Sequence, residues 1–592
     1  EGDASVDGTL ATLDPATLSN GFYTLRLTAR DIGGRTSTTT ATFVEIDTDT
    51  KAGDYRRSDA DLTVDLGGVG YTLVRQYSSL DTTPGAFGAG WSLPGRDIRF
   101  ESNVAVTGRE ALGVYDAYAE GTRIWMTLPD GTRAAFRFAP VAETVGTVQF
   151  FRPGWIADDG GAWTLASTDV LLTKGGTKFY AAATAQPYNP MAPGFDGADF
   201  TLTGPDGTRY VLDAADGVQQ IVTTTGKRLF VSDNGVTAEN GATLQFLRDA
   251  GGRIERAVAP DGTTLVYQYG AAGELLAVRN LTSGAGARYA YEAGRLASVV
   301  VVGQSGFGIE YAADGSVRTL PVIADLGGSA EFTGDVPEGD LAAGATALYA
   351  FSVRASEIAA TNGGQLILRV AVTGSAGLDA ATPTIPGFTP LSVQRTGDRV
   401  VALYAFDREG LYQLRLSGAN GSAGHYAVEL SVAGDVNLDG MVDGADGVVM
   451  DAGGPSTDVD GDGDTDRNDR QVMYANFGMR MNLGPQIAAT MPLVFTHEGL
   501  PIRVDLATVA ADPDGDIVFY RVLSAAHGSA ALSADGRAVI FTPDAGFTGA
   551  AAFEIMADDG FNASAPAQVA VTVSSAPLVS LEFRRQIGRA HV

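Results

Sequence analysis

Apolar and polar residues alternate over short stretches along most of the chain, which is the pattern of half-buried β-strands. In residues 22–29, for example, Tyr23, Leu25 and Leu27 alternate with polar residues. Asp-Gly turns inside Pro-Asp-Gly-Thr phrases separate such stretches at 130–131, 206–207 and 261–262. The longest apolar run covers the seven residues 400–406, far fewer than the roughly 20 that span a bilayer. We therefore predict a mainly β, multidomain chain without a membrane span.

A second pattern repeats every 21 residues between 252 and 317. The repeated positions are a glycine and, two residues later, an aliphatic residue: Gly252 and Ile254, Gly273 and Leu275, Gly294 and Leu296, Gly315 and Val317. Tyrosines precede these glycines at 267, 269, 289, 291 and 311. A fixed period of about 20 residues indicates stacked repeats, here hairpins whose turns use the positive φ of glycine. We expect the tyrosines to pack in the core; the alternative is a platform for stacking carbohydrate.

Two further stretches strengthen the repeat interpretation. They are YTLVRQYSSL at 71–80 and FGAGWSL at 87–93. Together with the 21-residue period, they resemble RHS/YD-repeat proteins, which are large bacterial surface or secreted β-structures. The resemblance implies a β-repeat region over residues 49–321. Residues 1–48 are interpreted as the last strands of an Ig-like sandwich.

Two segments are predicted to be β-sandwiches. In residues 322–433, short alternating strands are expected at 347–353, 365–370, 410–414 and 424–430. This segment resembles the pre-peptidase C-terminal type of sandwich, a noncatalytic accessory; the alternative is an unrelated jelly roll. Residues 482–575 carry phrases such as DPDGD at 512–516, FTP at 541–543 and DDG at 558–560. These phrases resemble cadherin-like repeats of bacterial adhesins.

Acidic residues between the two sandwiches have the spacing of paired calcium loops. The first loop places candidate ligands at positions 1, 3, 5, 7, 9 and 12: Asp435, Asn437, Asp439, Met441, Asp443 and Asp446. The second loop repeats this layout 23 residues later: Asp458, Asp460, Asp462, Asp464, Asp466 and Asp469. Side-chain oxygens at alternate positions, a carbonyl at position 7 and Gly at position 6 suit a hard cation that prefers six to eight oxygens. Calcium is the predicted cofactor.

Both loops end in Asp, and this pairing resembles a dockerin, so residues 434–481 are assigned to a dockerin-like module. Cohesin-binding dockerins carry a hydroxyl pair at positions 10 and 11, where this chain has Gly444-Ala445 and Arg467-Asn468. Cohesin docking is therefore disfavoured, whereas calcium binding is supported. The alternative is a solvated acidic linker.

A second calcium site is predicted in the cadherin-like segment. Its candidate ligands are Asp512, Asp514 and Asp516, with Glu498 or Asp558. The alternative is that Asp-Pro-Asp-Gly serves only as a turn.

Composition narrows the possible functions. A length of 592 residues suggests roughly four domains, and the absence of Cys excludes disulfides and thiolate chemistry. The net charge of −29 disfavours nucleic acid and anionic lipid as partners, and residues 434–469 alone hold 11 Asp against one Arg. The acidic charge is therefore concentrated where calcium is expected.

No catalytic signature is found in the sequence. Three of the four histidines, His425, His497 and His527, lie inside strand or turn phrases, and no nucleophile elbow, phosphate loop or HExxH motif occurs. Carboxylate pairs of glycoside hydrolases leave no short motif. We expect no enzyme in this portion of the chain.

The predicted function is that of an extracellular, calcium-binding bacterial surface protein with an adhesive or structural role. Its expected partner is a protein or glycan at the cell surface. The alternatives are the accessory and docking portion of a secreted polysaccharide-degrading enzyme, or a fragment of an RHS-type toxin-delivery shell. Both ends of the chain are expected to be cut, and in 576–592 the last residues are interpreted as a sequencing artefact.

Overall fold

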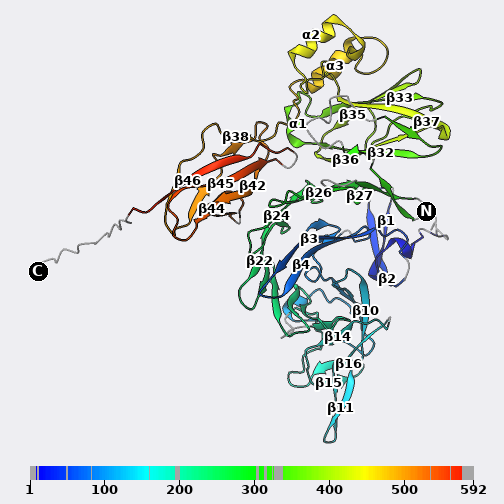
Figure 1. Cartoon of the computed structure of the whole chain (residues 1–592). Coiled ribbons are helices and arrows are strands. Elements are labelled where there is room, and N and C mark those ends of the chain that lie inside the picture. Colours follow the sequence, from blue (N-terminus) through cyan, green and yellow to red (C-terminus); the bar gives the residue numbers. More distant parts are fainter. Residues whose placement is uncertain are drawn as a thin grey trace, which may run out of the picture. The chain divides into compact units, whose positions relative to one another are not determined.

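The computed structural model confirms a mainly β, multidomain chain (Figure 1). It describes residues 9, 12–31, 33–48, 51–81, 83–158, 160–193, 200–301, 306–312, 316–322, 324–325, 338–533, 535–559 and 562–576. Gly315, Gly560 and the tail 577–592 lie outside the described residues. The chain divides into two compact units: 1–280 with 285–327 and 331–479, and 281–284 with 328–330 and 480–592.

One antiparallel sheet of 14 strands dominates the first unit. Its strands, in spatial order, are β14 (Thr164–Ser167), β17 (Phe200–Thr203), β18 (Arg209–Asp213), β19 (Gly217–Val222), β20 (Arg228–Ser232), β21 (Gly235–Ala238), β22 (Thr243–Arg248), β23 (Ile254–Val258), β24 (Thr264–Tyr269), β25 (Leu275–Asn280), β26 (Gly286–Glu292), β27 (Arg295–Val301), β28 (Phe307–Tyr311) and β29 (Val317–Pro321). From β17 onward each strand pairs with the next strand in sequence. The sheet is therefore a long meander of hairpins.

The 21-residue period corresponds to one hairpin of this sheet. Gly252, Gly273 and Gly294 adopt φ of 80°, 87° and 77° in successive turns, which an L-residue side chain disfavours. The register shifts by one residue just before each of these turns, in the β22–β23, β24–β25 and β26–β27 pairs. Since the same bulge recurs in these three hairpins, the repeats share one backbone conformation.

The tyrosines of the repeats tie neighbouring hairpins together. The hydroxyls of Tyr269, Tyr291 and Tyr311 donate to the carbonyl oxygens of Ile254, Leu275 and Leu296, at 2.6, 3.0 and 2.9 Å. Tyr267 and Tyr289, two residues before Tyr269 and Tyr291, are fully buried. Core packing is thus confirmed, and a carbohydrate platform is wrong for the two buried tyrosines.

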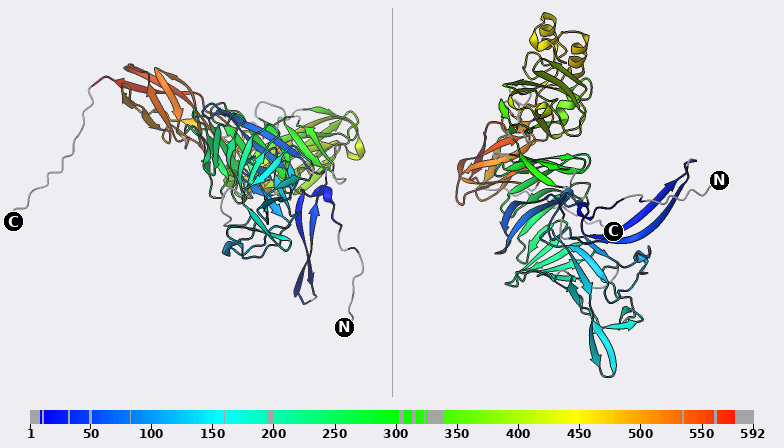
Figure 2. Two further views of the ribbon diagram at one scale, coloured as in Figure 1. Left: turned by 90° about the horizontal axis from the view of Figure 1, so that it is seen from below. Right: turned by 90° about the vertical axis from the view of Figure 1, so that its right-hand side faces the viewer.

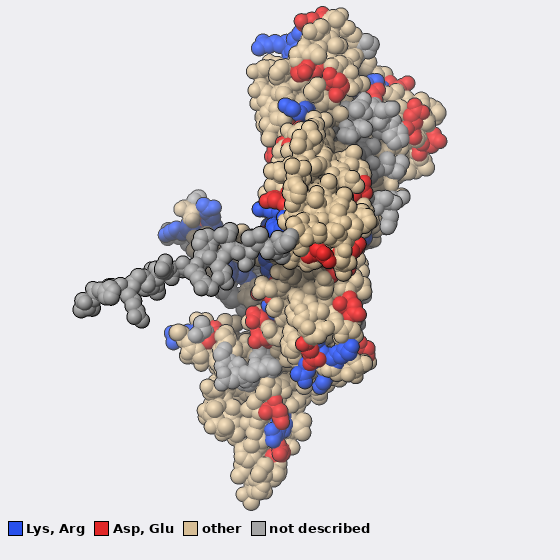
Figure 3. All heavy atoms as spheres, turned by 60° about the vertical axis from the view of Figure 1, so that its left-hand side comes forward, with Lys and Arg blue, Asp and Glu red and all other residues tan. Residues whose placement is uncertain are grey.

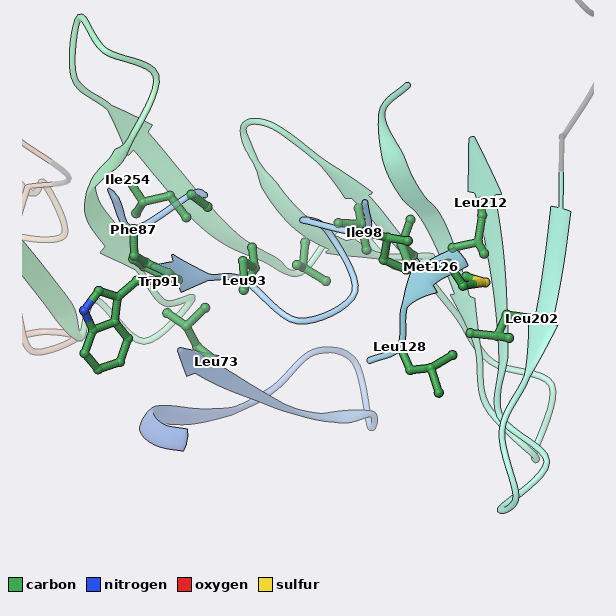
Figure 4. Packing of buried hydrophobic residues seen from close by; sticks show 14 of the residues in the cluster. Leu73, Phe87, Trp91, Leu93, Ile98, Met126, Leu128, Leu202, Leu212 and Ile254 are labelled. Atoms are coloured by element: carbon green, nitrogen blue, oxygen red, sulfur yellow. The ribbon is translucent and has the colours of Figure 1, made fainter. Parts of the chain in front are cut away.

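The N-terminal part of the repeat region packs against the long sheet. It contains β3 (Arg56–Asp65), β4 (Gly70–Ser78) and β7 (Trp91–Ser92) in one sheet, and β5 (Pro84–Gly85) with β6 (Gly88–Ala89) in another. Figure 2 shows β3 and β4, in blue, beside the green strands of the long sheet. In Figure 4, Leu73, Phe87 and Trp91 from this part lie in one apolar core with Ile254. The two stretches that carry the RHS/YD resemblance therefore supply core residues.

A buried arginine stands at the centre of this core. Arg75, 1% exposed, pairs with Asp61 at 2.5 Å and with Asp59 at 3.7 Å. Its guanidinium carbon lies 4.8 Å from the Trp91 ring centre, and its Nη2 donates to the Tyr289 hydroxyl at 2.9 Å. Two carboxylates and the surrounding rings thus replace the water that the charge loses on burial.

Two smaller sheets and one hairpin complete the region before residue 200. Their strands are β8 (Phe100–Ser102), β9 (Arg123–Thr127), β10 (Arg133–Phe138) and β13 (Trp155–Ala157) in one sheet; β11 (Val141–Val145), β12 (Val148–Arg152), β15 (Leu172–Gly175) and β16 (Lys178–Ala181) in the other; and β1 (Gly21–Arg30) with β2 (Thr36–Ile46) in the hairpin. The strand predicted at 22–29 lies within β1. Its predicted half-burial is wrong for Leu25 and Leu27, which are 40% and 51% exposed.

Residues 324–325 and 338–433 form a β-sandwich with one short helix. The larger sheet holds β31 (Gly339–Leu341), β37 (Gly424–Val432), β33 (Leu366–Ser375), β35 (Arg399–Phe406) and β34 (Ser392–Thr396); the smaller holds β30 (Ala324–Asp325), β32 (Thr346–Val353) and β36 (Gly410–Ser417); the helix is α1 (Ala355–Ala360). Three of the four predicted strands fall within β32, β36 and β37, and the fourth, 365–370, begins one residue before β33. However, residues 347–353 of β32 are all buried instead of alternating. The second face is covered because Leu348 and Ala350 share a core cluster with Ala290 and Val300 of the long sheet.

Two helices follow the sandwich, α2 (Gly444–Ala452) and α3 (Arg467–Asn476). The first of them, α2, ends directly before the sequence Gly453-Gly454-Pro455. Among the described residues, no helix is long and apolar enough to cross a membrane.

The second unit is a small β-sandwich. One sheet holds β39 (Val494–His497), β46 (Ala567–Ser574), β45 (Gly549–Asp558) and β42 (Phe519–Ala526); a second holds β40 (Ile502–Asp505), β44 (Ala538–Pro543) and β43 (Gly528–Leu532); a third pairs β38 (Gln486–Ile487) with β41 (Ala510–Ala511). The core between them includes Val504, Phe541, Phe553 and Val571.

Candidate metal centre

The first acidic loop wraps around two buried carboxylates. Asp446, fully buried at position 12, accepts hydrogen bonds from the backbone N–H of Val436 at 2.9 Å and of Asp443 at 2.9 Å. Asp435, at position 1, accepts from the N–H of Asp439 at 3.2 Å and of Gly440 at 3.0 Å. The two ends of the loop are thereby held together, and position 12 also lies in the first turn of α2.

The second loop repeats the hydrogen bonds to position 12 and the bond from position 6 to position 1. Asp469 accepts from the N–H of Val459 at 2.7 Å and of Asp466 at 2.8 Å, and Asp458 accepts from the N–H of Gly463 at 3.2 Å. Position 6 has positive φ in both loops, 85° at Gly440 and 104° at Gly463. Both loops are therefore copies of one structure, as their sequences predicted.

Several predicted ligands lie close enough to share a cation. Asp458, Asp460 and Asp462 each offer a carboxylate oxygen within 4.8 Å of the others, and so do Asp464, Asp466 and Asp469. In the first loop, the Asn437 amide donates to Asp439 Oδ2 at 2.9 Å, which brings positions 3 and 5 together. Met441, at position 7, donates its N–H to Asp439. An all-oxygen donor set fits calcium or magnesium and not a thiophilic metal.

Position 9 of each loop also begins a helix. Asp443 accepts from the N–H of Ala445 at 2.7 Å and Asp466 from that of Asn468 at 2.5 Å. Asp443 and Asp466 are therefore the N-cap residues of α2 and α3, as well as predicted ligands of the two loops.

The loops concentrate negative charge. Burial, together with the charges of Asp446 and Asp439, raises the pKa of Asp435 to about 6. Burial also raises the pKa of Asp460, and repulsion from Asp462 raises that of Asp464. Acidic side chains are visible at the end that carries α2 and α3, the top of Figure 3. A bound cation would relieve this repulsion.

The second predicted site is only partly assembled in the 480–576 sandwich. Asp512 Oδ1 accepts from the N–H groups of Asp514 and Asp516, whereas its Oδ2 is buried without a hydrogen-bond partner. Asp558, 1% exposed, ends β45. Glu498 donates its N–H to Ser574, which lies beside the Gly549 end of the ten-residue β45. Glu498 and Asp558, the two alternative ligands, thus lie toward opposite ends of β45, and which of them completes the site stays a prediction.

Residues 482–572 match the model of a bacterial Ig domain, Big_9. Such domains are typical of extracellular or surface-exposed proteins. The match gives residues 482–572 a bacterial Ig-like identity; the cadherin-like assignment stays a prediction. No curated protein matches the chain.

Solved structures resemble the chain only weakly. An endo-fucoidan hydrolase from glycoside hydrolase family 107 matches with 10% identity and a TM-score of 0.14 over 54% of this chain and 40% of that one. The M60 catalytic domain with two CBM51 domains of Clostridium perfringens ZmpB matches with 8% identity and a TM-score of 0.12 over 74% and 40%. The extracellular domain of protocadherin GammaB4 gives 11% identity and a TM-score of 0.14 over 81% and 77%. At such TM-scores these likenesses carry no argument about function.

Two buried asparagines beside the acidic groups were missed from the sequence. Asn476, the last residue of α3, is fully buried and bonded to backbone atoms of the 338–433 sandwich. Asn482, 2% exposed, donates to Asp559 of the bacterial Ig domain at 2.6 Å, and its Oδ1 has no partner. Their only sequence signal is a polar residue next to apolar ones, which is too common to be specific.

The three described histidines lie apart in the sequence and in different surroundings. His425 contacts Asp340 at 3.0 Å and Glu338 at 3.4 Å on the surface. His497 contacts the backbone oxygen of Glu498, and His527 stacks on Phe547 with 4.2 Å between ring centres. Within the part of the chain that the structure describes, these contacts involve no serine, threonine or cysteine nucleophile.

Proposed function

We propose that this chain is part of an extracellular bacterial surface protein that binds calcium and serves an adhesive or structural role. The observation that carries the proposal is the pair of loops at 435–446 and 458–469. Both have the same hydrogen bonds to position 12, the same positive φ at position 6 and oxygen-only side-chain donors. Two copies of a cation loop in one short segment are difficult to explain as a solvated linker.

The surroundings of the loops support a surface role. The bacterial Ig domain belongs to a class that is typical of exposed proteins. The 14-stranded meander and its recurring bulge support the RHS/YD-like assignment of residues 49–321. Paired loops with Asp at position 12 support the dockerin-like assignment of 434–481, with calcium as its ion. The partner proposed for the whole protein is a protein or glycan at the cell surface.

Calorimetric titration of the full chain with calcium tests the proposal. Asp446→Asn and Asp469→Asn each remove one negative ligand, and each variant is expected to lose one strongly bound ion. Asp451→Asn is the matched control, since Asp451 lies in the same acidic segment but is exposed and paired with Arg470. Equal calcium binding by the Asp446/Asp469 double variant and the original chain would contradict the proposal.

The bacterial Ig domain is proposed to hold a further cation near Asp512 and Asp558. The buried, unpaired oxygens Asp512 Oδ2 and Asn482 Oδ1 favour this, because such atoms are costly without a partner. Asp512→Asn is expected to remove an ion that remains in the Asp446/Asp469 double variant. Unchanged binding in a triple variant with Asp512→Asn would contradict this site.

A further inference from the structure

Position 4 of the second predicted calcium loop lies directly on the neighbouring sandwich, whereas position 4 of the first is exposed. Gly461, at position 4 of the second loop, is so close to β35 that an added Cβ would lie 2.6 Å from Val401 Cβ. The equivalent residue of the first loop is Leu438, which is 46% exposed. Both residues adopt positive φ, 81° and 59°, so the two loops differ here in their environment and not in their backbone shape.

A hydrogen-bonded path joins the second loop to strand β33. Asp469 at position 12 accepts from the N–H of Val459, and the carbonyl of Val459 accepts from Arg369 Nε of β33 at 3.1 Å. Arg369 is in turn paired with Glu429 of β37 at 3.3 Å. Two hydrogen bonds, with Val459 between them, thus connect a predicted ligand of the second loop to the sandwich.

The end of α3 is fixed to the same sandwich. Asn476 Oδ1 accepts from the Ile367 N–H at 2.9 Å, and its Nδ2 donates to the carbonyls of Ile367 at 2.7 Å and Ala433 at 2.8 Å. The carbonyl of Ala475 accepts from the Gly363 N–H at 2.8 Å. The sandwich therefore satisfies backbone groups that the end of a helix leaves without partners.

An apolar core continues across this contact. Ile367 and Leu403 of the sandwich form one buried cluster with Met450 of α2 and with Val436 and Val459 of the two loops. Burial of this kind stabilises both sides together, since neither keeps its core when they separate.

We propose that calcium in the second loop controls docking of the 434–479 module onto its own sandwich through Val459, Arg369 and Asn476. The module is then a calcium-dependent clamp on β33, and the C-terminal end of α3 is occupied within the chain. This inference rests on the proposed calcium binding. Because the ion holds Asp458 and Asp469 at fixed positions, it also holds Val459 and Gly461 against β33 and β35.

Hydrogen exchange of the full chain tests the clamp. The amides of Asn362, Gly363 and Ile367 donate to Phe477, Ala475 and Asn476, so their exchange reports docking directly. Calcium is expected to slow exchange in a peptide covering 362–369 by about tenfold, with no comparable change in β36. Asp469→Asn is expected to abolish this protection, whereas Asp446→Asn keeps most of it.

A second pair of variants leaves every calcium ligand in place. Gly461→Leu introduces the side chain of Leu438, the equivalent residue of the first loop, at a position where Val401 leaves no room. This variant is expected to bind calcium but to lose the protection of 362–369. Leu438→Gly, the reverse exchange in the exposed loop, is the control and is expected to retain both. If calcium binds but the protection does not change, or survives in Gly461→Leu, the clamp is wrong and the proposed function stands. If titration shows no calcium binding, both are wrong.

Discussion

The core of the first unit contains a buried positive charge, the guanidinium of Arg75. Arg75 is enclosed by Asp59, Asp61 and the rings of Trp91 and Tyr289, in a region that is otherwise apolar. An ion pair in such a place is not a strong source of stability, but removing one partner leaves an unpaired buried charge. Asp435 shows the opposite case, a carboxylate whose neighbours are also negative.

Replacing Arg75 with Ala is expected to reduce the free energy of unfolding by about 3–5 kcal/mol, because Asp61 is left buried and unpaired. Arg35→Ala is the control: Arg35 is 89% exposed, its pair with Asp31 lies on the surface, and the expected loss is below about 1 kcal/mol. Urea unfolding of the full chain measures both. Equal losses would show that Arg75 is not a central contact.

Asp435 is expected to make the proposed calcium binding depend on pH. Its pKa is raised from 3.8 to about 6 in the folded chain. Without calcium, protonation of Asp435 therefore stabilises the folded state relative to the unfolded state. That contribution to stability is full below pH 3.8 and is lost as the pH rises through 6. Calcium needs the carboxylate, so its affinity for the first loop should fall between pH 7.5 and 5. Titrations at the two pH values check this, and Asp435→Asn should weaken binding at pH 7.5 and flatten the dependence.

At the scale of elements, the repeat hairpins are linked by hydroxyls as well as by strand pairing. Tyr291 has two such contacts: it donates to the Leu275 carbonyl and accepts from Trp91 Nε1 at 2.7 Å. Among the described residues, the Tyr269 hydroxyl makes one hydrogen bond, to the Ile254 carbonyl. The hydroxyls of Tyr269, Tyr291 and Tyr311 therefore connect neighbouring repeats, and that of Tyr291 also connects them to the N-terminal part.

Tyr291→Phe is expected to destabilise the first unit by about 1–3 kcal/mol, because both the carbonyl of Leu275 and the indole N–H of Trp91 lose a partner. Tyr269→Phe should cost less, since one acceptor is affected. The two variants have the same change in atoms, and their denaturation midpoints can be compared directly. A larger effect of Tyr269→Phe would contradict the assigned role of Tyr291.

Local elements could be predicted from the sequence, and contacts between distant elements could not. The acidic loops are set by residues at most 11 positions apart, and the hairpins by a 21-residue period, so the backbone shape of both could be predicted, whereas calcium in the loops stays a prediction. Both faces of β32 are buried because one of them packs on the 14-stranded sheet, whose last strand precedes β32 in the sequence. Asn476 likewise meets a partner 109 residues away. Leu25 and Leu27 show the converse, an apolar pattern that the fold leaves exposed.

At the scale of the whole molecule, the acidic charge and the modular fold act together. The chain has a net charge of −29, and its loops gather carboxylates at one end of the first unit. Cations that bind only the folded state stabilise it by mass action. Calcium should therefore affect stability more than its small share of the contacts suggests.

Chelation of calcium is expected to lower the melting temperature of the first unit. Saturation at 100 times the dissociation constant contributes about 2.7 kcal/mol for each ion. Differential scanning calorimetry with calcium and with chelator measures the shift. The Asp446/Asp469 double variant should melt alike in both conditions, whereas Asp451→Asn should behave as the original chain does. A melt of the original chain that chelator leaves unchanged would contradict calcium stabilisation.

The buried arginine also imposes an order on folding. Neighbouring strands of the long meander can pair soon after they leave the ribosome, because little chain separates them. Arg75 and Tyr289, by contrast, are 214 residues apart, and closing so long a loop carries a larger entropic cost. The core around Arg75 is therefore completely packed only after the later repeats have been synthesised and have folded. A chain interrupted before β26 lacks Tyr289, so unfinished copies differ from complete ones at the centre of the core.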